Sequence, residues 1–182
     1  MSVLNIVQYP APLLNEKSEP VTEVTPAIAQ LIDDMLETMY AAPGVGLAAP
    51  QVGILKRVVV IDVGSPEGKQ NPIAFVNPTI ISREGKVVWE EGCLSCPNLL
   101  VPVERSQKIT VEGLSKEGKK IEMKAEDLLA VAFQHEIDHL DGITLVSRLS
   151  RLKRDLYLKK LKKGNLEEWS EKTSRKEKTY IG

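Results

Sequence analysis

The chain has 182 residues, of which 42% are hydrophobic and 27% charged, so we expect one globular domain with its own core. The formal net charge of -1 excludes a whole-protein field that attracts nucleic acid, and no apolar run suits a membrane helix, so neither a DNA nor a membrane partner is expected. Two cysteines are too few for a disulfide framework, and the N-terminus has no signal-peptide pattern, so we expect a cytoplasmic protein.

A first helix is predicted near the N-terminus. Thr25 can cap it, Pro26 suits its first position, and apolar residues recur at helical spacing as far as Met39. Pro43 ends the helix. The segment GVGLAAPQVG at residues 44–53 follows and is too glycine-rich to form a stable helix.

The middle of the chain has the composition of β-strands. Stretches rich in Val and Ile are bounded by Gly, Pro and Ser, as strands usually are. The predicted strands span residues 57–62, 73–82, 86–90, 108–113 and 120–123. The last two flank the turn sequence LSKEGK, so we expect them to form a hairpin.

Two more helices are predicted in the last third of the chain. The first spans about residues 126–140, and Gly142 follows it where a C-terminal cap belongs. The second spans about residues 147–163 and is strongly basic, and the polar tail at residues 164–182 is expected to be flexible. Strands followed by helices indicate an α+β fold with mostly antiparallel sheets around a central helix, and with an N-terminal and a C-terminal helix.

The strongest chemical signal is the sequence His135-Glu136-Ile137-Asp138-His139 on the second predicted helix. Positions four apart lie on the same face of a helix, so both imidazoles can bind one metal ion. Glu136 lies between them and is close enough to act on a metal-bound water. Because the chain has only 2 histidines, chance rarely places them four positions apart. We therefore predict that the central helix binds a metal.

A catalytic metal site needs a third protein ligand and an open position for water. A histidine at position 145 would complete one known pattern, but that residue is Leu145. A glutamate about 20 residues after the second histidine would complete another, but Lys159 and Lys160 stand there. The remaining soft donors are Cys93 and Cys96, and a thiolate with two imidazoles suits zinc or ferrous iron. The residues alone do not decide between these two cysteines.

Three separated segments resemble the signature motifs of the peptide deformylases, in the same order along the chain. They are GVGLAAPQ at residues 44–51, EGCLS at 91–95 and QHEIDHL at 134–140. The resemblance covers about residues 5–163 and implies a single catalytic domain over residues 1–163. It implies metal-dependent hydrolysis of the N-formyl group from the N-terminal formyl-methionine of nascent polypeptides, with release of formate.

The resemblance also assigns chemical roles to residues. It makes Cys93 the third metal ligand beside the two histidines, and Glu136 the general acid and base. Gln51 and the backbone N–H of Leu94 would stabilise negative charge on the substrate oxygen in the transition state. The ligand set permits zinc, iron, nickel or cobalt, and the resemblance points to one ferrous ion per chain.

Further residues are expected to contact the substrate. The glycine-rich segment lacks the Gly-Lys ending of a phosphate loop, so we expect an extended peptide to pair along Val45 and Gly46. We also expect Glu91, the first residue of the second motif, to contact the substrate. The candidate walls of a methionine pocket, for which ordinary core packing is the alternative, are Leu128, Val131 and Ala132.

The last predicted helix carries a run of lysines and arginines between leucines. Such a helix can simply be amphipathic, with a solvated basic face. The resemblance favours a second function, docking on ribosomal RNA, where neutralised phosphates would make binding sensitive to salt.

Two other functions remain open. A metallopeptidase of another kind would use His135, Glu136 and His139 in the same way, but this chain lacks the downstream third ligand that such an enzyme needs. A non-catalytic module with a structural metal is disfavoured, because a closed site has no use for Glu136 as a base. Cys93 and Cys96 also match the spacing of a redox pair, although a neutral replacement of an aliphatic residue by Cys96 is favoured.

Overall fold

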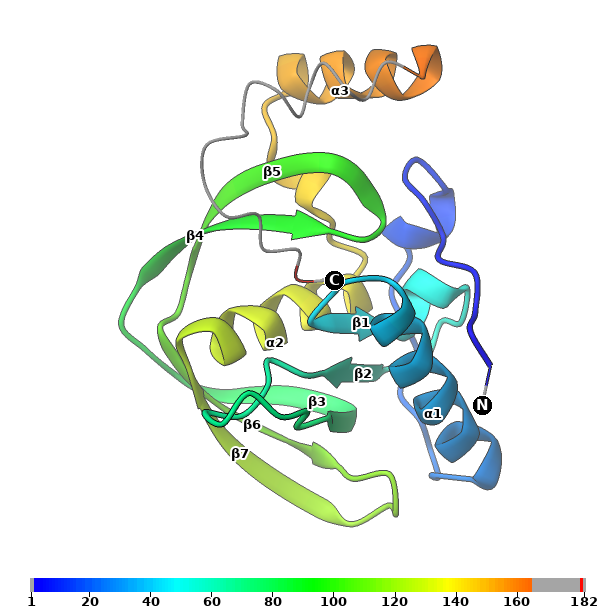
Figure 1. The fold of residues 1–182 in the computed structure, drawn as a ribbon, viewed down its shortest axis with the longest axis vertical. Coiled ribbons are helices and arrows are strands. Elements are labelled where there is room, and N and C mark those ends of the chain that lie inside the picture. The colour runs from blue at the N-terminus through cyan, green and yellow to red at the C-terminus, as the bar shows by residue number, and fades with distance from the viewer. Residues whose placement is uncertain (1, 165–180, 182) are drawn as a thin grey trace.

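The computed structural model describes residues 2–164 and 181 of the chain. Two antiparallel sheets lie on opposite sides of one helix, α2 (Figure 1). The larger sheet has five strands in the order β1-β2-β3-β6-β7, and the smaller sheet is the pair β4-β5. The predicted α+β fold with mostly antiparallel sheets is therefore confirmed.

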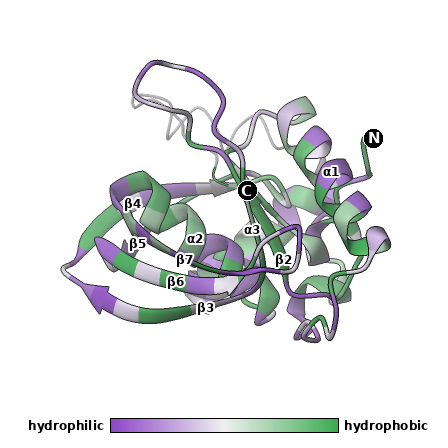
Figure 2. Cartoon of the chain, turned by 90° about the horizontal axis from the view of Figure 1, so that it is seen from below, coloured by the Kyte–Doolittle hydropathy of each residue, from purple (hydrophilic) through white to green (hydrophobic). Residues whose placement is uncertain are grey.

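Four strands of the larger sheet follow the predicted Val- and Ile-rich stretches, whereas β1 lies in the glycine-rich segment and is not predicted as a strand. Its strands are β1 (Gly46–Ala48), β2 (Val58–Ile61), β3 (Ile73–Glu84), β6 (Lys108–Leu114) and β7 (Lys120–Glu126). β6 and β7 form the predicted hairpin, and hydrophobic residues alternate with others along β6 (Figure 2). Because alternate side chains point to opposite faces of a strand, one face of this sheet packs against the core.

The smaller sheet is a hairpin of β4 (Val87–Cys93) and β5 (Cys96–Arg105). The sequence predicts β4 but not β5. Pro97 and Pro102 stand within β5, and proline is uncommon inside strands because it cannot donate a ladder hydrogen bond. A two-stranded sheet tolerates both prolines, since each of its strands has an unpaired edge.

The first helix, α1 (Pro26–Ala41), forms where it is predicted. The side chain of Thr25 accepts a hydrogen bond from the N–H of Ile28 at 3.4 Å and so caps the helix. Met35 and Met39 are fully buried against β1 and β2. This packing fixes the glycine-rich segment that follows the helix.

The central helix, α2 (Asp127–Leu140), also matches its prediction. It packs against β1, β2, β6 and β7 on one side. There the rings of Phe133 and Phe75 pack edge-on, with their centroids 5.2 Å apart. Gly142 follows it with a φ of +74°, the left-handed conformation expected for a helix cap. The helix therefore carries its histidines into the interior between the two sheets.

The last helix, α3 (Arg151–Lys163), begins later than predicted. A 3-10 turn at Leu145–Arg148 precedes it, and Ser150 caps the helix by accepting a hydrogen bond from the N–H of Lys153. Tyr157 is fully buried and its hydroxyl donates to the carbonyl of Pro97 at 2.8 Å, which docks α3 onto β5.

The predicted polar tail at residues 164–182 falls mostly on residues 165–180 and 182, which lie outside the described residues. Ile181 is described and is fully buried in the main hydrophobic cluster, which a flexible polar tail does not predict. Across the described part of the chain, no helix has the length and apolar character needed to cross a membrane.

Candidate metal centre

Three potential metal ligands from two distant segments meet between the sheets. His135 and His139 lie one turn apart on α2, with ring centroids 5.0 Å apart, and Cys93 ends β4. One donor atom from each residue lies within 4.8 Å of the others, and all three residues are buried. Cys96 stands opposite Cys93 across the β4-β5 turn and is outside this cluster.

The donor atoms are spaced as ligands of a single ion would be. Sγ of Cys93 lies 3.4 Å from Nε2 of His139. Metal–ligand bonds of about 2.0 to 2.3 Å in tetrahedral geometry place sulfur and nitrogen about 3.5 Å apart. Burial, together with Cys96, raises the pKa of Cys93 to about 12, so its thiolate needs a neighbouring positive charge. Spacing and chemistry both fit a divalent metal.

Glu136 is a buried carboxylate without a partner. Neither of its oxygens forms a hydrogen bond within the residues that the structure describes, and its side chain is 0% exposed. Burial raises the pKa of Glu136 to about 7. A buried carboxyl in this range is suited to accepting and returning a proton near neutral pH.

Gly46 makes room for that carboxylate. A Cβ added at Gly46 would lie 2.5 Å from Oε1 of Glu136, closer than carbon and oxygen can approach. We expected the glycines of this segment to admit a substrate backbone, and the structure shows a second requirement at Gly46. The first motif therefore contacts the third motif directly.

A buried ion-pair network lies behind the ligands. Oε1 of Glu91 lies 2.9 Å from Nδ1 of His135, and Arg105 donates to both oxygens of Glu91 at 2.8 Å. Burial favours the neutral acid, but the hydrogen bonds from Arg105 and His135 hold the pKa of Glu91 below its usual value. Arg105 also donates to Asp138 at 2.6 Å, and Asp138 accepts from Arg148 at 2.7 Å.

The sequence does not predict this network. Its motifs lead us to expect Glu91 among the residues that contact the substrate. Its carboxylate is 0% exposed and both oxygens are engaged by protein groups. Arg105 lies at the far end of β5, so no local pattern links it to the second motif. Asp138 stands inside the third motif, but nothing in the sequence identifies Arg105 and Arg148 as its partners.

Gln51 lies on the other side of Cys93 and is also fully buried. Its Oε1 accepts from the N–H of Ala48 at 2.9 Å, which fixes the direction of the amide. Its Nε2 lies 3.2 Å from Oγ of Ser95 and 3.7 Å from Sγ of Cys93. Leu94 is half-buried and lies between Cys93 and Ser95 at the β4-β5 turn. The amide N–H of Gln51 is thus held beside the metal cluster.

The remaining candidate residues differ in how deeply they are buried. Val45 is partly buried and packs against the same hydrophobic cluster as Val131 and Ala132, which are fully buried. Leu128 is half-buried and is not part of this cluster, whereas Leu129 packs against it. Val131 and Ala132 are therefore buried in the core on α2, one turn before His135.

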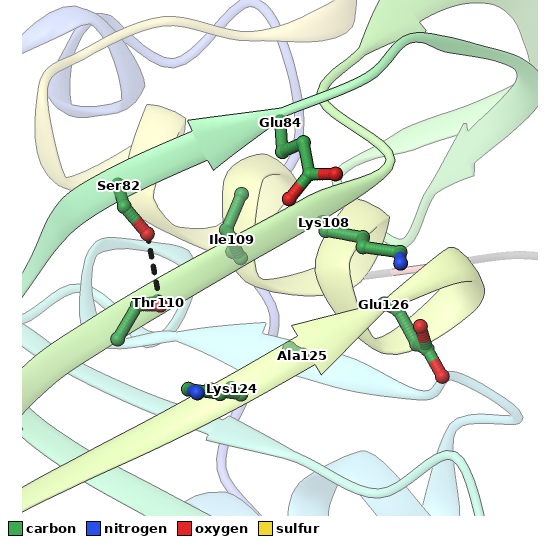
Figure 3. A pocket seen from close by; sticks show the side chains of 8 residues that line it. All are labelled: Ser82, Glu84, Lys108, Ile109, Thr110, Lys124, Ala125 and Glu126. Carbon is green, nitrogen blue, oxygen red and sulfur yellow. Dashed lines mark hydrogen bonds between the residues drawn. The ribbon is translucent and has the colours of Figure 1, made fainter.

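A separate hollow on the described surface lacks these features. It measures about 590 Å³, lies over β3, β6 and β7 and is lined mainly by charged and small polar side chains (Figure 3). It shares no residue with the metal cluster and contains neither histidine nor cysteine. We therefore take the buried Cys-His-His cluster as the functional centre.

Comparison with known proteins agrees with this geometry. A family model described as polypeptide deformylase matches residues 3–155. The chain belongs to the peptide deformylase family. A peptide deformylase from Thermodesulfovibrio yellowstonii is 49% identical over 162 residues, covering 89% of this chain and 98% of the relative. One from Acidobacterium capsulatum is 50% identical over 163 residues, covering 90% and 96%.

Solved deformylase structures have the same fold. A crystal structure of peptide deformylase from Ehrlichia chaffeensis aligns with a TM-score of 0.85 and 41% identity, covering 90% of this chain and 97% of that one. Another from the same organism, in complex with actinonin, gives 0.85 and 43%, covering 90% and 98%. The predicted function, hydrolytic removal of the N-formyl group from N-terminal formyl-methionine, is confirmed at the level of the family.

Proposed function

We propose that Cys93, His135 and His139 together hold one divalent metal ion. The proposal is supported by the spacing of their donor atoms, 3.4 Å between Sγ of Cys93 and Nε2 of His139, and by their burial. One thiolate and two imidazoles suit ferrous iron and zinc, and nickel or cobalt can occupy such a set. We infer ferrous iron as the resident ion, on the strength of the family resemblance.

Within this centre we propose that Glu136 transfers the proton. A bound divalent ion would lower the pKa of water and polarise the formyl carbonyl. Glu136 takes a proton from the attacking water and returns it to the departing amine nitrogen as the formyl C–N bond breaks. The observation that carries this proposal is the buried carboxylate of Glu136, whose oxygens have no partner among the described residues.

Gln51 and the backbone N–H of Leu94 are proposed to stabilise the oxygen of the formyl group. That oxygen becomes negative as water adds to the carbon, and fixed donors stabilise such charge more strongly than they stabilise the ground state. The proposal is supported by the bond from Ala48 to Oε1 of Gln51, which leaves the NH₂ group directed toward Cys93. Loss of one such donor costs about 3 kcal/mol in the transition state.

The peptide substrate is proposed to lie between β1 and β4. Val45 and Gly46 would pair with its backbone as an added strand. Val131 and Ala132 would border the pocket for the methionine side chain, with Leu128 further out. Glu91 is better suited to positioning His135 than to contacting substrate, because both its oxygens are engaged within the protein.

The direct test compares a formyl-methionyl peptide with its unformylated counterpart. We expect hydrolysis of the first only, with formate as a product. Glu136→Gln should abolish turnover while the metal content stays at one ion per chain. A Glu136→Gln variant that keeps wild-type turnover would show that another group moves the proton. Peptide-bond cleavage in the unformylated peptide would favour the alternative metallopeptidase.

We also propose that α3 docks on the ribosome. Leu152 and Leu156 are exposed, 70% and 43%, beside exposed basic side chains of the same helix. A surface that combines basic and apolar groups suits RNA with neighbouring protein. Arg148 is held by Asp138 and is less available to a partner.

Residues 1–163 are proposed to form the catalytic domain, and residues 164–182 to follow it as a tail, whose Ile181 packs back onto the domain. A cytoplasmic location is proposed with them. It is supported by the two buried free cysteines, which suit a reducing compartment.

A further inference from the structure

The penultimate residue of the chain connects the edges of the two sheets. The N–H of Ile181 donates to the carbonyl of Gly92 in β4 at 3.1 Å, and its own carbonyl accepts from the N–H of Val45 at 3.1 Å. Val45 immediately precedes β1, the edge strand of the larger sheet. Figure 1 shows this end of the chain beside β1 and β4, over α2. Ile181 thus uses backbone groups that an added strand would use.

The side chain of Ile181 is equally well accommodated. It is 0% exposed and belongs to the same hydrophobic cluster as Val131 and Ala132, against which Val45 and Trp89 also pack. Burial of a full isoleucine side chain favours this position. Both its backbone and its side chain are therefore bound as a peptide ligand would be.

The site that Ile181 fills is next to the catalytic residues. Gly92 precedes Cys93 in the chain, and Val45 precedes Gly46, which touches the carboxylate of Glu136. The proposed function assigns Val45 to the substrate backbone, and Val131 and Ala132, which share a cluster with Ile181, to the methionine pocket. A formylated peptide and Ile181 cannot occupy them together.

The connection is long enough for this arrangement. Residues 165–180 join the end of α3 to Ile181, and a chain of that length can extend about 50 Å. A compact domain of this size has a radius of gyration of about 16 Å. Tethering also gives an intramolecular ligand an effective concentration in the millimolar range, so even weak intrinsic affinity fills the site.

We propose that the C-terminal segment around Ile181 is an intramolecular competitor of the peptide substrate. This inference rests on the proposed location of the substrate between β1 and β4. The segment must leave the groove before a formyl-methionyl peptide binds, which raises the apparent KM without changing kcat. The apolar side chain of Ile181 and its two backbone hydrogen bonds, to Gly92 and Val45, are the features that occupy this position.

The kinetic test uses the metal-loaded full chain, a chain ending at residue 179, and the variants Ile181→Asp and Ile181→Val. Truncation and Ile181→Asp should each lower KM for a formyl-methionyl peptide about fivefold with kcat unchanged. Ile181→Val keeps an apolar side chain and should behave like the unaltered chain. An acetylated Lys-Thr-Tyr-Ile-Gly peptide should inhibit the truncated enzyme competitively. An unchanged KM in both the truncated chain and Ile181→Asp would overturn the proposal. A lowered melting temperature beside that unchanged KM would show that Ile181 only stabilises the fold.

A second measurement does not depend on turnover. Hydrogen exchange at the Val45 N–H should be slow in the full chain and about fivefold faster in Ile181→Asp, the same factor as for KM, because the acceptor carbonyl has moved away. Equal exchange in both would overturn the proposal even in an inactive protein. Protection that increases with protein concentration would assign the occupying segment to a second copy and would also overturn it. If neither chain hydrolyses formyl peptides, the proposed function fails while this exchange result still decides occupancy.

Discussion

Oε1 of Glu91 lies 2.9 Å from Nδ1 of His135, on the side of the imidazole away from the metal cluster. A carboxylate in this position accepts the Nδ1–H and leaves Nε2 unprotonated to bind metal. Arg105 fixes the carboxylate through two hydrogen bonds, so the orientation of the ring is set by residues of the smaller sheet. The second and third motifs are joined by this contact as well as by the proposed metal.

The first prediction concerns Glu91→Gln. A neutral amide is a weaker acceptor than a carboxylate, so we expect metal affinity to fall about 10- to 100-fold. Competition against a chromophoric chelator measures this affinity. The control is Glu90→Gln, which alters an exposed neighbour in the same strand and should leave the affinity unchanged. Equal affinities for both variants would show that Glu91 does not orient the ligand.

The second prediction concerns Arg105→Met. This change leaves Glu91 buried without its cation and removes a partner from Asp138, so the free energy of unfolding should fall by about 3 to 5 kcal/mol. Urea denaturation of the metal-free protein measures the loss. Arg151→Met removes an exposed arginine and should change the free energy by less than about 1 kcal/mol. Similar small losses in both variants would contradict a stabilising role for the network.

The third prediction concerns Gly46→Ala. The new methyl group would meet Oε1 of Glu136 at 2.5 Å, so the carboxylate must move. We expect kcat to fall about 100-fold while the metal content is retained, since proton transfer depends on position. Gly44→Ala meets only the flexible end of Leu94 and should lower kcat by a few-fold at most. Steady-state kinetics on a formyl-methionyl peptide compare the two, and equal rates would refute the tight fit at Gly46.

The fourth prediction concerns the exposed lysines of α3. Reversing Lys153, Lys159 and Lys163 to glutamate should weaken ribosome association at least about tenfold at physiological salt. Hydrolysis of a short formyl peptide should stay at the wild-type rate. Cosedimentation with ribosomes at several salt concentrations measures the first effect. Unchanged cosedimentation would remove the docking role from this helix.

Local patterns in the sequence predict much of the fold and part of the candidate centre. Helical spacing and caps predict α1 and α2 because these signals lie within one turn of the chain. β5 is missed because its two prolines oppose the strand pattern, and α3 is predicted too early because a 3-10 turn continues the apolar spacing. His135 and His139 are found from spacing alone, whereas the choice of Cys93 needs the family resemblance.

Other contacts depend on pairing between distant segments. Arg105 reaches Glu91 only because β5 folds back beside β4. Ile181 meets Val45 and Gly92 from the far end of the chain, and nothing in a polar tail sequence predicts that contact. In both cases the contact depends on tertiary geometry, which the hydrophobic periodicity of the sequence does not encode.

The most direct test of the central claim is metal content after purification without oxygen. We expect one divalent ion per chain in the unaltered protein and in Cys96→Ala, and none in Cys93→Ala after dialysis against a weak chelator. Loss of the ion from Cys96→Ala, or its retention in Cys93→Ala, would contradict a centre built from Cys93 and the two histidines of α2.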